Sequence, residues 1–281
     1  MKKILYGFII STSLVSANSD IFVSTGKKDY TNSKTKIDGT TNTIGTTHTY
    51  EGSILKLQYS KDIVYRENPI THQSIETLDV KKYNLNYRYN IDKQLSFKTS
   101  YIKIIDNLAP TDQGKVYGLG SSYNIKKGLG VAFDLYKSDY EQFNVNQYDL
   151  SIYKGFKIAD VKFKATLIAK SIIIDGEKYA AYTFKDKDYF TTGLKIGALY
   201  KQYKVGISAF TGTRIFTVLN DGDKVQHHAM EQNKTYSLNI GKKFENLDIA
   251  LIYSYQNGKE LSENQDNVDT KVTLLNFKYR F

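Results

Sequence analysis

The amino-acid sequence predicts an all-β chain that crosses a membrane as an antiparallel up-and-down β-barrel. Three observations support this prediction: many segments alternate apolar and polar residues, an export signal starts the chain, and an aromatic-rich strand ends it. Tyr and Phe are abundant, with 24 and 14 residues, whereas there are two Pro and no Cys. Because only alternate residues of a barrel strand contact lipid, such a chain can cross a membrane without any long apolar run.

The last thirteen residues, 269–281, have the period-two pattern of a strand with two unlike faces. One face carries aromatic, apolar or small side chains: Thr273, Leu275, Phe277, Tyr279 and Phe281. This ending resembles the C-terminal assembly signal of Gram-negative outer-membrane β-barrels, which has a terminal Phe after apolar or aromatic residues at alternate positions. The resemblance implies insertion by the outer-membrane assembly machinery, through the strand ending at Phe281. It identifies a porin-like class and no specific family.

The first residues have the pattern of a secretory signal peptide. Lys2 and Lys3 precede the apolar run 4–10, and small residues lead to Ala17. We expect residues 1–17 to be removed and residues 18–281 to form one barrel domain in the bacterial outer membrane. An N-terminal membrane anchor is the alternative, but the apolar core is too short for a spanning helix.

Seven hairpins, and therefore 14 strands, are predicted from short turn-like segments that alternate with longer connections. The short turns are expected at 60–62, 90–93, 125–128, 157–160, 201–202 and 245–246. The longer loops, 31–46 and 220–233 among them, would face the cell exterior, as is usual for such barrels. The hairpin that uses residues 63–67 as a strand is the weakest. If 63–74 is irregular, the count falls to 12.

The last lipid-facing residue of each returning strand is aromatic in this reading. These residues are Tyr59, Tyr89, Tyr123, Phe156, Tyr200, Phe244 and Phe281. An aromatic ring at every such position predicts an interfacial girdle at the periplasmic edge.

The residues assigned to the lumen are mostly basic, with 14 basic and three acidic side chains. The basic ones are Lys56, Arg66, Lys82, Arg88, Lys98, Lys162, Lys164, Lys170, Lys195, Lys204, Arg214, Lys243, Lys278 and Arg280. The acidic ones are Asp134, Asp149 and Asp248. Three acids are too few to neutralise the lysines by pairing.

Five lysines are expected at one level of a narrow water-filled pore, together with two of the acids. The predicted pore-lining residues are Lys56, Lys98, Lys164, Lys195, Lys278, Asp134 and Asp149. A positive band between low-dielectric walls raises the local anion concentration and repels cations. The pattern therefore predicts a passive, porin-like channel, surrounded by outer-membrane lipid, for small anionic or neutral hydrophilic solutes.

No enzyme activity, cofactor, metal site or nucleic-acid partner is predicted. The loops are modest and none has its own apolar core, so no plug is expected and a monomer is favoured. Two alternatives stay open. One is an outer-membrane hydrolase (protease or lipase) with a rim site near His227 and His228, downstream of Asp221 and Asp223. The other is a structural or adhesive barrel that displays its Thr-rich first loop.

Overall fold

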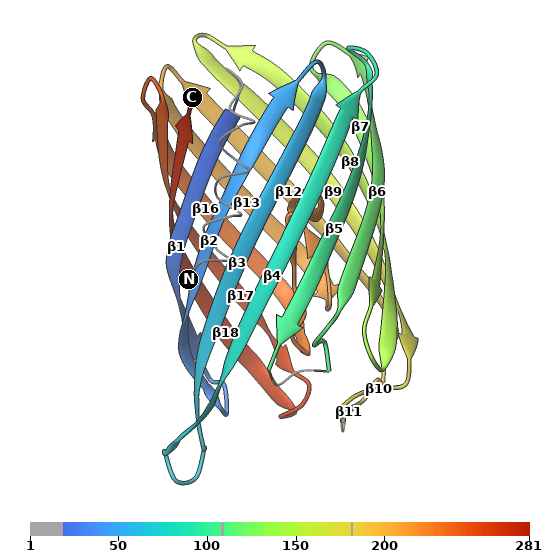
Figure 1. Ribbon diagram of the computed structural model, residues 1–281, viewed down its shortest axis with the longest axis vertical. Coiled ribbons are helices and arrows are strands. Elements are labelled where there is room, and N and C mark those ends of the chain that lie inside the picture. Colours follow the sequence, from blue (N-terminus) through green and yellow to red (C-terminus); the bar gives the residue numbers. More distant parts are fainter. Residues whose placement is uncertain (1–18, 108–109, 181) are drawn as a thin grey trace, which may run out of the picture.

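A computed structural model describes residues 19–107, 110–180 and 182–281, so the predicted signal peptide, residues 1–17, lies outside the described residues. The chain forms a closed antiparallel barrel of 14 strands (Figure 1). The barrel strands are β1 (Ser19–Thr31), β2 (Lys36–Tyr50), β3 (Ser53–Glu67), β4 (Ser74–Asn90), β5 (Leu95–Asp106), β6 (Lys115–Lys126), β7 (Leu129–Asp139), β8 (Phe143–Ile158), β9 (Val161–Gly176), β12 (Asp188–Tyr200), β13 (Tyr203–Arg214), β16 (Met230–Lys243), β17 (Leu247–Glu260) and β18 (Gln265–Arg280). The predicted fold class and the count of 14 strands are confirmed. The described residues contain no helix long and apolar enough to cross a membrane.

The C-terminal strand closes the barrel. β18 pairs with β17 on one side and with β1 on the other, from Asp20 opposite Arg280 to Thr31 opposite Asp269. Its two faces are those the sequence pattern predicts, because Phe277 and Tyr279 are exposed on the outer face. The alternation that predicted this strand is therefore kept where β18 pairs with β1, a pairing that we call the seam.

The two ends of the barrel differ. The C-terminus and the short turns lie at one end (top in Figure 1), and the longer loops lie at the other. The aromatic girdle at the short-turn end contains Tyr50, Tyr89, Tyr123, Phe156, Tyr200, Phe244 and Phe281, each at least 40% exposed. Six members are as predicted, but Tyr50 takes the place assigned to Tyr59.

Tyr59 was assigned to the girdle because a short turn was predicted directly after it, at residues 60–62. Residues 60–62 lie inside β3, and the first short turn is Glu51-Gly52 between Tyr50 and Ser53. Both turn residues have positive φ, 43° and 84°, as a two-residue hairpin turn of the twist-compatible type requires. Asp62 resembled a turn residue in the sequence, but it faces the lumen between Lys28 and Lys82, at 2.6 Å from each.

The predicted first loop, 31–46, is mostly strand. β2 includes residues 36–50, and only 32–35 connect β1 to it. The error has a physical cause, because the outer face of β2 carries mainly the polar residues Thr40, Asn42 and Thr46, with Ile44 the apolar residue among them. Backbone pairing on both sides keeps β2 in the sheet without a hydrophobic alternation. Residues 63–67, predicted as a separate strand, are the end of the 15-residue β3, which removes one strand from the prediction. The strand β2 adds one, so the count of 14 is unchanged.

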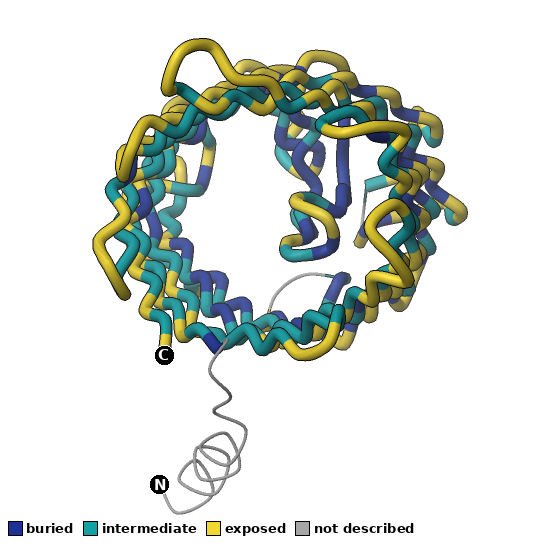
Figure 2. Tube along the Cα trace, turned by 90° about the horizontal axis from the view of Figure 1, so that it is seen from above, coloured by how far each residue is buried: buried dark blue, intermediate teal, exposed yellow. Residues whose placement is uncertain are grey.

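Two short hairpins are not part of the barrel wall and form separate two-stranded sheets. One is β10 (Lys178–Tyr179) with β11 (Tyr182–Thr183), between β9 and β12 at the loop end. The other is β14 (Val218–Leu219) with β15 (Lys224–Val225), joined by the 3-10 turn η1 (Asn220–Gly222). Figure 2 shows the second hairpin inside the ring of strands, with much of its chain buried.

Candidate functional site

The segment 215–229, which we call the inward loop, folds from the loop end into the barrel lumen. It connects β13 to β16 and contains β14, η1 and β15. The expectation that no loop forms a plug was wrong. The sequence signal was present, because Asn220-Asp221-Gly222 follows the mainly apolar run 215–219, and an Asp-Gly pair beside apolar residues favours a hairpin.

The base of the inward loop is held by an aromatic cluster. Phe216 is fully buried, and its ring centroid lies 4.7 Å from that of Phe143 and 5.6 Å from that of Tyr179. Tyr140 and Phe184 complete the cluster at 5.9 and 6.1 Å from Phe216. The apolar partners of the loop thus come from the wall and from neighbouring loops, which is why the loop needed no apolar core of its own.

We expect Phe216→Ala to loosen the inward loop. Truncating a buried Phe costs about 3–5 kcal/mol. The measurement is limited trypsin digestion of the folded protein, following cleavage after Lys224, which the intact barrel shields. Cleavage should be much faster than in the wild type. Ile70→Ala, at an exposed position of another loop, is the control. Equal cleavage of the Phe216 variant and the wild type would contradict an aromatic anchor.

A buried glutamine clamps the first strand of the loop hairpin. The Gln147 side chain, on β8, donates to the Val218 carbonyl at 2.9 Å and accepts from the Val218 amide at 2.8 Å. Lys170 on β9 also donates to the Val218 carbonyl and forms an ion pair with Asp149. The loop backbone is therefore hydrogen-bonded to the wall well inside the lumen.

The tip of the inward loop is held on the far wall by polar contacts. Asp223 accepts from Lys56 Nζ at 2.6 Å and from Asn86 Nδ2 at 2.7 Å. Asn84 Nδ2 donates to the carbonyls of Gly222 and Asp223, both at 2.9 Å. β4, which carries Asn84 and Asn86, is seven strands from β13 in the ring of 14. The loop therefore reaches from one side of the barrel to the opposite side.

Close packing at the tip requires a glycine. A Cβ on Gly222 would lie 2.7 Å from Ser100 Oγ on β5, and the φ of Gly222 is 92°. A larger residue would therefore be strained in backbone and side chain, so this glycine permits the contact with the far wall.

Asp221, beside Gly222, faces the lumen cations. Lys98 Nζ lies 3.5 Å from its carboxylate and Arg88 Nη2 lies 3.9 Å away. Burial acts to raise the pKa of this carboxyl, but the charges of Lys98, Lys195 and Arg88 outweigh burial and lower it. The loop tip is therefore anionic at neutral pH and attracted to the basic wall.

The inward loop contributes to the walls of two lumen cavities. The larger, about 860 Å³, lies toward the short-turn end, and the smaller, about 230 Å³, is lined by β1–β5 and β16–β18 together with the loop. The larger cavity is lined by seven basic and three acidic side chains, and the smaller by four basic and two acidic ones. Both chambers therefore carry an excess of positive charge.

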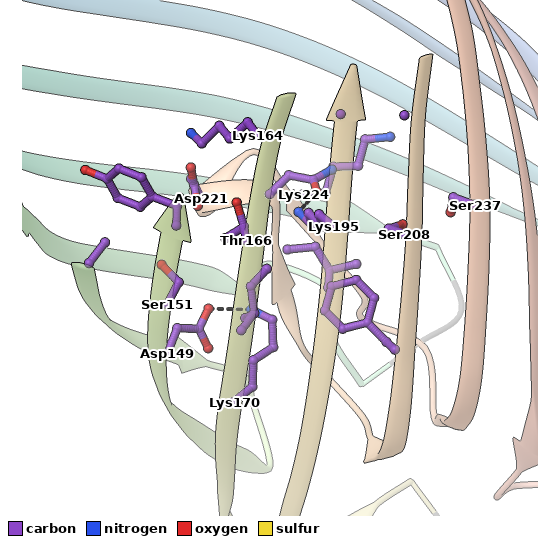
Figure 3. A pocket seen from close by; sticks show the side chains of 18 of the residues that line it. Asp149, Ser151, Lys164, Thr166, Lys170, Lys195, Ser208, Asp221, Lys224 and Ser237 are labelled. Carbon is purple, nitrogen blue, oxygen red and sulfur yellow. Dashed lines mark hydrogen bonds and ion pairs between the residues drawn. The ribbon is translucent and has the colours of Figure 1, made fainter. Parts of the chain in front are cut away.

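Three lysines of the larger cavity, Lys164, Lys195 and Lys224, have no carboxylate within ion-pair distance among the described residues (Figure 3). Lys164 Nζ lies over the ring of Tyr153, 4.8 Å from its centroid. Lys195 Nζ lies 3.2 Å from Asn220 Oδ1. The ammonium groups of Lys164 and Lys195 therefore contact neutral groups rather than carboxylates.

The predicted pore-lining residues separate into three groups. Lys98, Lys164, Lys195, Asp134 and Asp149 line the larger cavity. Lys56 is bound by Asp223 of the inward loop. Lys278 lies at the seam, 2.6 Å from Asp20. The structure thus brings five of the seven together, while conduction along them stays a prediction.

The expectation that ion pairing could not absorb the lysines was wrong in part. Lys56, Lys98 and Lys278 are all paired, and the acids involved include three that strand parity did not assign to the lumen. These are Asp20, Asp221 and Asp223. Asp20, at the start of β1, was not assigned to the lumen in the sequence analysis. Asp221 and Asp223 lie in the lumen because they belong to the inward loop. Lys224, also on that loop, was missed for the same reason.

The two histidines of the hydrolase alternative lie in the lumen rather than on the rim. His227 is 2% exposed and its ring centroid is 4.3 Å from that of His228. Burial lowers the pKa of His227 to about 3, so its imidazole is neutral at physiological pH. Asp221 and Asp223 contact the wall cations instead of these rings.

A Ser–His hydrogen bond does occur between β1 and β2, from Ser19 Oγ to His48 Nδ1 at 2.9 Å. The other nitrogen of His48 lies 3.3 Å from the Thr46 hydroxyl, where a catalytic triad would place a carboxylate. Among the described residues, no group of three or more His, Cys, Asp or Glu side chains is arranged to hold a metal ion. The contacts of His48 with Ser19 and Thr46 therefore lack the carboxylate of a catalytic triad.

Comparison with known proteins supports the fold. No family model matches the sequence, and no curated protein matches it. The barrel is similar to a bacterial polysaccharide outer membrane secretin, with a TM-score of 0.61 and 7% identity over 95% of this chain and 99% of that chain. It is also similar to the CymD monoaromatic hydrocarbon channel, with a TM-score of 0.59 and 10% identity over 95% of this chain and 89% of that chain.

A third similar structure is the Pseudomonas putida toluene transporter TodX, with a TM-score of 0.58 and 9% identity over 96% of this chain and 91% of that chain. At these identities the likeness shows the fold. The closed 14-strand wall and its neighbours define the class: this is a β-barrel of the bacterial outer-membrane type.

Proposed function

We propose that this protein is a passive outer-membrane channel that passes small anionic or neutral hydrophilic solutes and prefers anions. The observation that carries the proposal is the group formed by Lys164, Lys195 and Lys224, which have no carboxylate partner among the described residues that line the larger cavity. In a narrow water-filled space with low-dielectric walls, such charges concentrate anions and repel cations.

The lining favours hydrophilic solutes. Nine Ser and Thr residues line the larger cavity together with the charged side chains. Two of the similar structures are described as a hydrocarbon channel and a toluene transporter. A hydrocarbon would have to displace water from these hydroxyl and ammonium groups without replacing its hydrogen bonds, at a cost that water-soluble solutes avoid. We therefore infer a different solute class for this chain.

The test is the zero-current potential of the purified protein in a planar bilayer under a KCl gradient. We expect the purified protein to form channels. We expect their zero-current potential to have the sign that results when chloride permeates more readily than potassium. Cation preference, or no conductance from a folded protein, would overturn the proposal. Liposome swelling with uncharged sugars would then measure the size limit for neutral solutes.

Assembly and oligomeric state are separate proposals. We propose that the outer-membrane assembly machinery inserts the barrel through the strand that ends at Phe281. A monomer was favoured partly because no loop was expected to fold inward, and that premise is wrong. The monomer stays a prediction, and the mass of the detergent-solubilised protein measured by light scattering tests it.

A further inference from the structure

The strands β3 to β7 are neighbours in the barrel wall (Figure 1). Each of them carries one outward-facing lysine toward the loop end, and together these lysines form a continuous band. We call this band the lysine row. Its members are Lys61, Lys81, Lys103, Lys115 and Lys137.

The strand register places each lysine beside the next. Lys61 is directly opposite Lys81, and Lys103 is directly opposite Lys115. Lys81 is opposite Ile105, two residues from Lys103 on the same face, and Lys137 is opposite Tyr117, two residues from Lys115. Direct partners in a sheet have Cβ atoms about 5 Å apart and diagonal ones about 7–8 Å apart. The row is therefore continuous.

A row of tyrosines lies immediately on the membrane side of the lysine row. Tyr59, Tyr83, Tyr101 and Tyr117 each lie two residues nearer the short-turn end than a lysine of the same strand. Tyr59 and Tyr83 have ring centroids 5.2 Å apart, and Tyr101 and Tyr117 have theirs 5.4 Å apart. Tyrosines of this kind lie at the level of the lipid headgroups. The lysines, one step further out, therefore lie at the level of charged headgroup atoms.

Three carboxylates lie near the five lysines of the row: Asp79, Asp112 beside Lys103, and Asp139, which is directly opposite Lys115. Lys61 pairs with Asp79 at 3.1 Å and Lys137 with Asp139 at 3.4 Å, so the ends of the row are partly neutralised. Lys103 Nζ donates to the Gln113 carbonyl.

Asp112, in the adjoining loop, uses Oδ1 to accept from the Asp106 amide. Lys81 and Lys115 have no side-chain hydrogen bond or ion pair among the described residues, because Asp139, directly opposite Lys115, pairs with Lys137.

At the seam between β1 and β18, two strands away from β3, outward-facing charges alternate in sign. Lys271 of β18 is directly opposite Asp29 of β1, and Lys27 lies 2.8 Å from Asp29. Like charges directly opposite each other in a sheet are destabilising. The row contains two such lysine pairs and only three carboxylates for five lysines, so its remaining positive charge favours binding of an external anion.

We propose that the lysine row binds the phosphate groups of a bisphosphorylated glycolipid in the outer leaflet. Clustered lysines at the headgroup level attract anionic lipids, and phosphate oxygens accept hydrogen bonds from several ammonium groups at once. The tyrosine row and the exposed Leu85 and Leu119 below it provide the apolar surface for the acyl chains. A soluble phosphate would use the lysines alone, so the apolar surface favours a lipid.

The experiment compares lipid retention by the wild type and by Lys81→Gln/Lys103→Gln/Lys115→Gln. Native mass spectrometry in an uncharged detergent would measure binding of bisphosphorylated lipid A, with phosphatidylglycerol and inorganic pyrophosphate as competitors. At about 1 kcal/mol for each lysine, we expect lipid A to bind the triple variant roughly 100-fold more weakly. The matched control is Lys154→Gln/Lys234→Gln/Lys242→Gln, which removes the same charge from outward positions elsewhere. It should bind like the wild type.

Heat-modified gel mobility would verify folding of each variant. If the triple variant does not fold, the single variants Lys81→Gln and Lys115→Gln should each weaken lipid A binding about fivefold. Equal binding to wild type and row variants would overturn the proposal, as would equal losses in the control. Competition by pyrophosphate at the same concentration would reassign the row to a soluble anion. Equal retention of phosphatidylglycerol would show that any anionic lipid suffices, which also overturns the assignment.

Discussion

Replacing residues 216–228 by a short Gly-Ser linker is expected to raise the single-channel conductance several-fold. The inward loop reaches from β13 to the opposite wall, where Asn84, Asn86 and Lys56 hold its tip. Removing it joins the two lumen cavities into one continuous path. The barrel should survive, because all fourteen strands keep their backbone partners without the loop. The measurement is conductance in a planar bilayer in 1 M KCl.

The control for this deletion is a linker of the same composition in place of residues 68–73, a loop that is exposed and projects from the loop end (Figure 1). It should leave the conductance at the wild-type value. An inward-loop deletion that folds but conducts like the wild type would mean that the loop does not restrict the pathway.

Charge reversal at the unpaired lysines is expected to change ion selectivity. Lys164→Glu/Lys195→Glu leaves five basic and five acidic side chains in the larger cavity, so the preference for anions should nearly vanish. Adding Lys224→Glu leaves four basic and six acidic ones, and the preference should reverse toward cations. Because the potential in a narrow pore acts exponentially on ion concentration, we expect the permeability ratio to change by about tenfold or more. The zero-current potential in a KCl gradient measures it.

Lys154→Glu/Lys234→Glu/Lys242→Glu is the matched control, because these lysines face outward from the wall. It carries the same change in net charge and should keep the wild-type selectivity. If the lumen and control variants shift the potential equally, net protein charge sets selectivity rather than the lumen. If neither lumen variant shifts it, Lys164 and Lys195 do not line the conducting path.

The barrel wall was largely predictable, because lipid on one face and water on the other impose a period of two on each strand. The exceptions identify where that constraint is weak. β2 was read as a loop because its outer face has Thr40, Asn42 and Thr46, so backbone pairing alone reveals it. Asp62 was read as a turn residue because a sequence does not show that Lys28 and Lys82 flank it.

The sequence by itself determined the class of fold, the number of strands and six of the seven residues of the aromatic girdle. Each of these depends on residue types repeated at a local spacing, which pairing between neighbouring strands preserves. Only the tertiary structure decided the position of the inward loop and the ion pairs it makes. Phe216 packs against Tyr140, Phe143, Tyr179 and Phe184, and Asp223 meets Lys56 167 positions away. Such contacts join residues that have no common period, so they exist only once the barrel has closed.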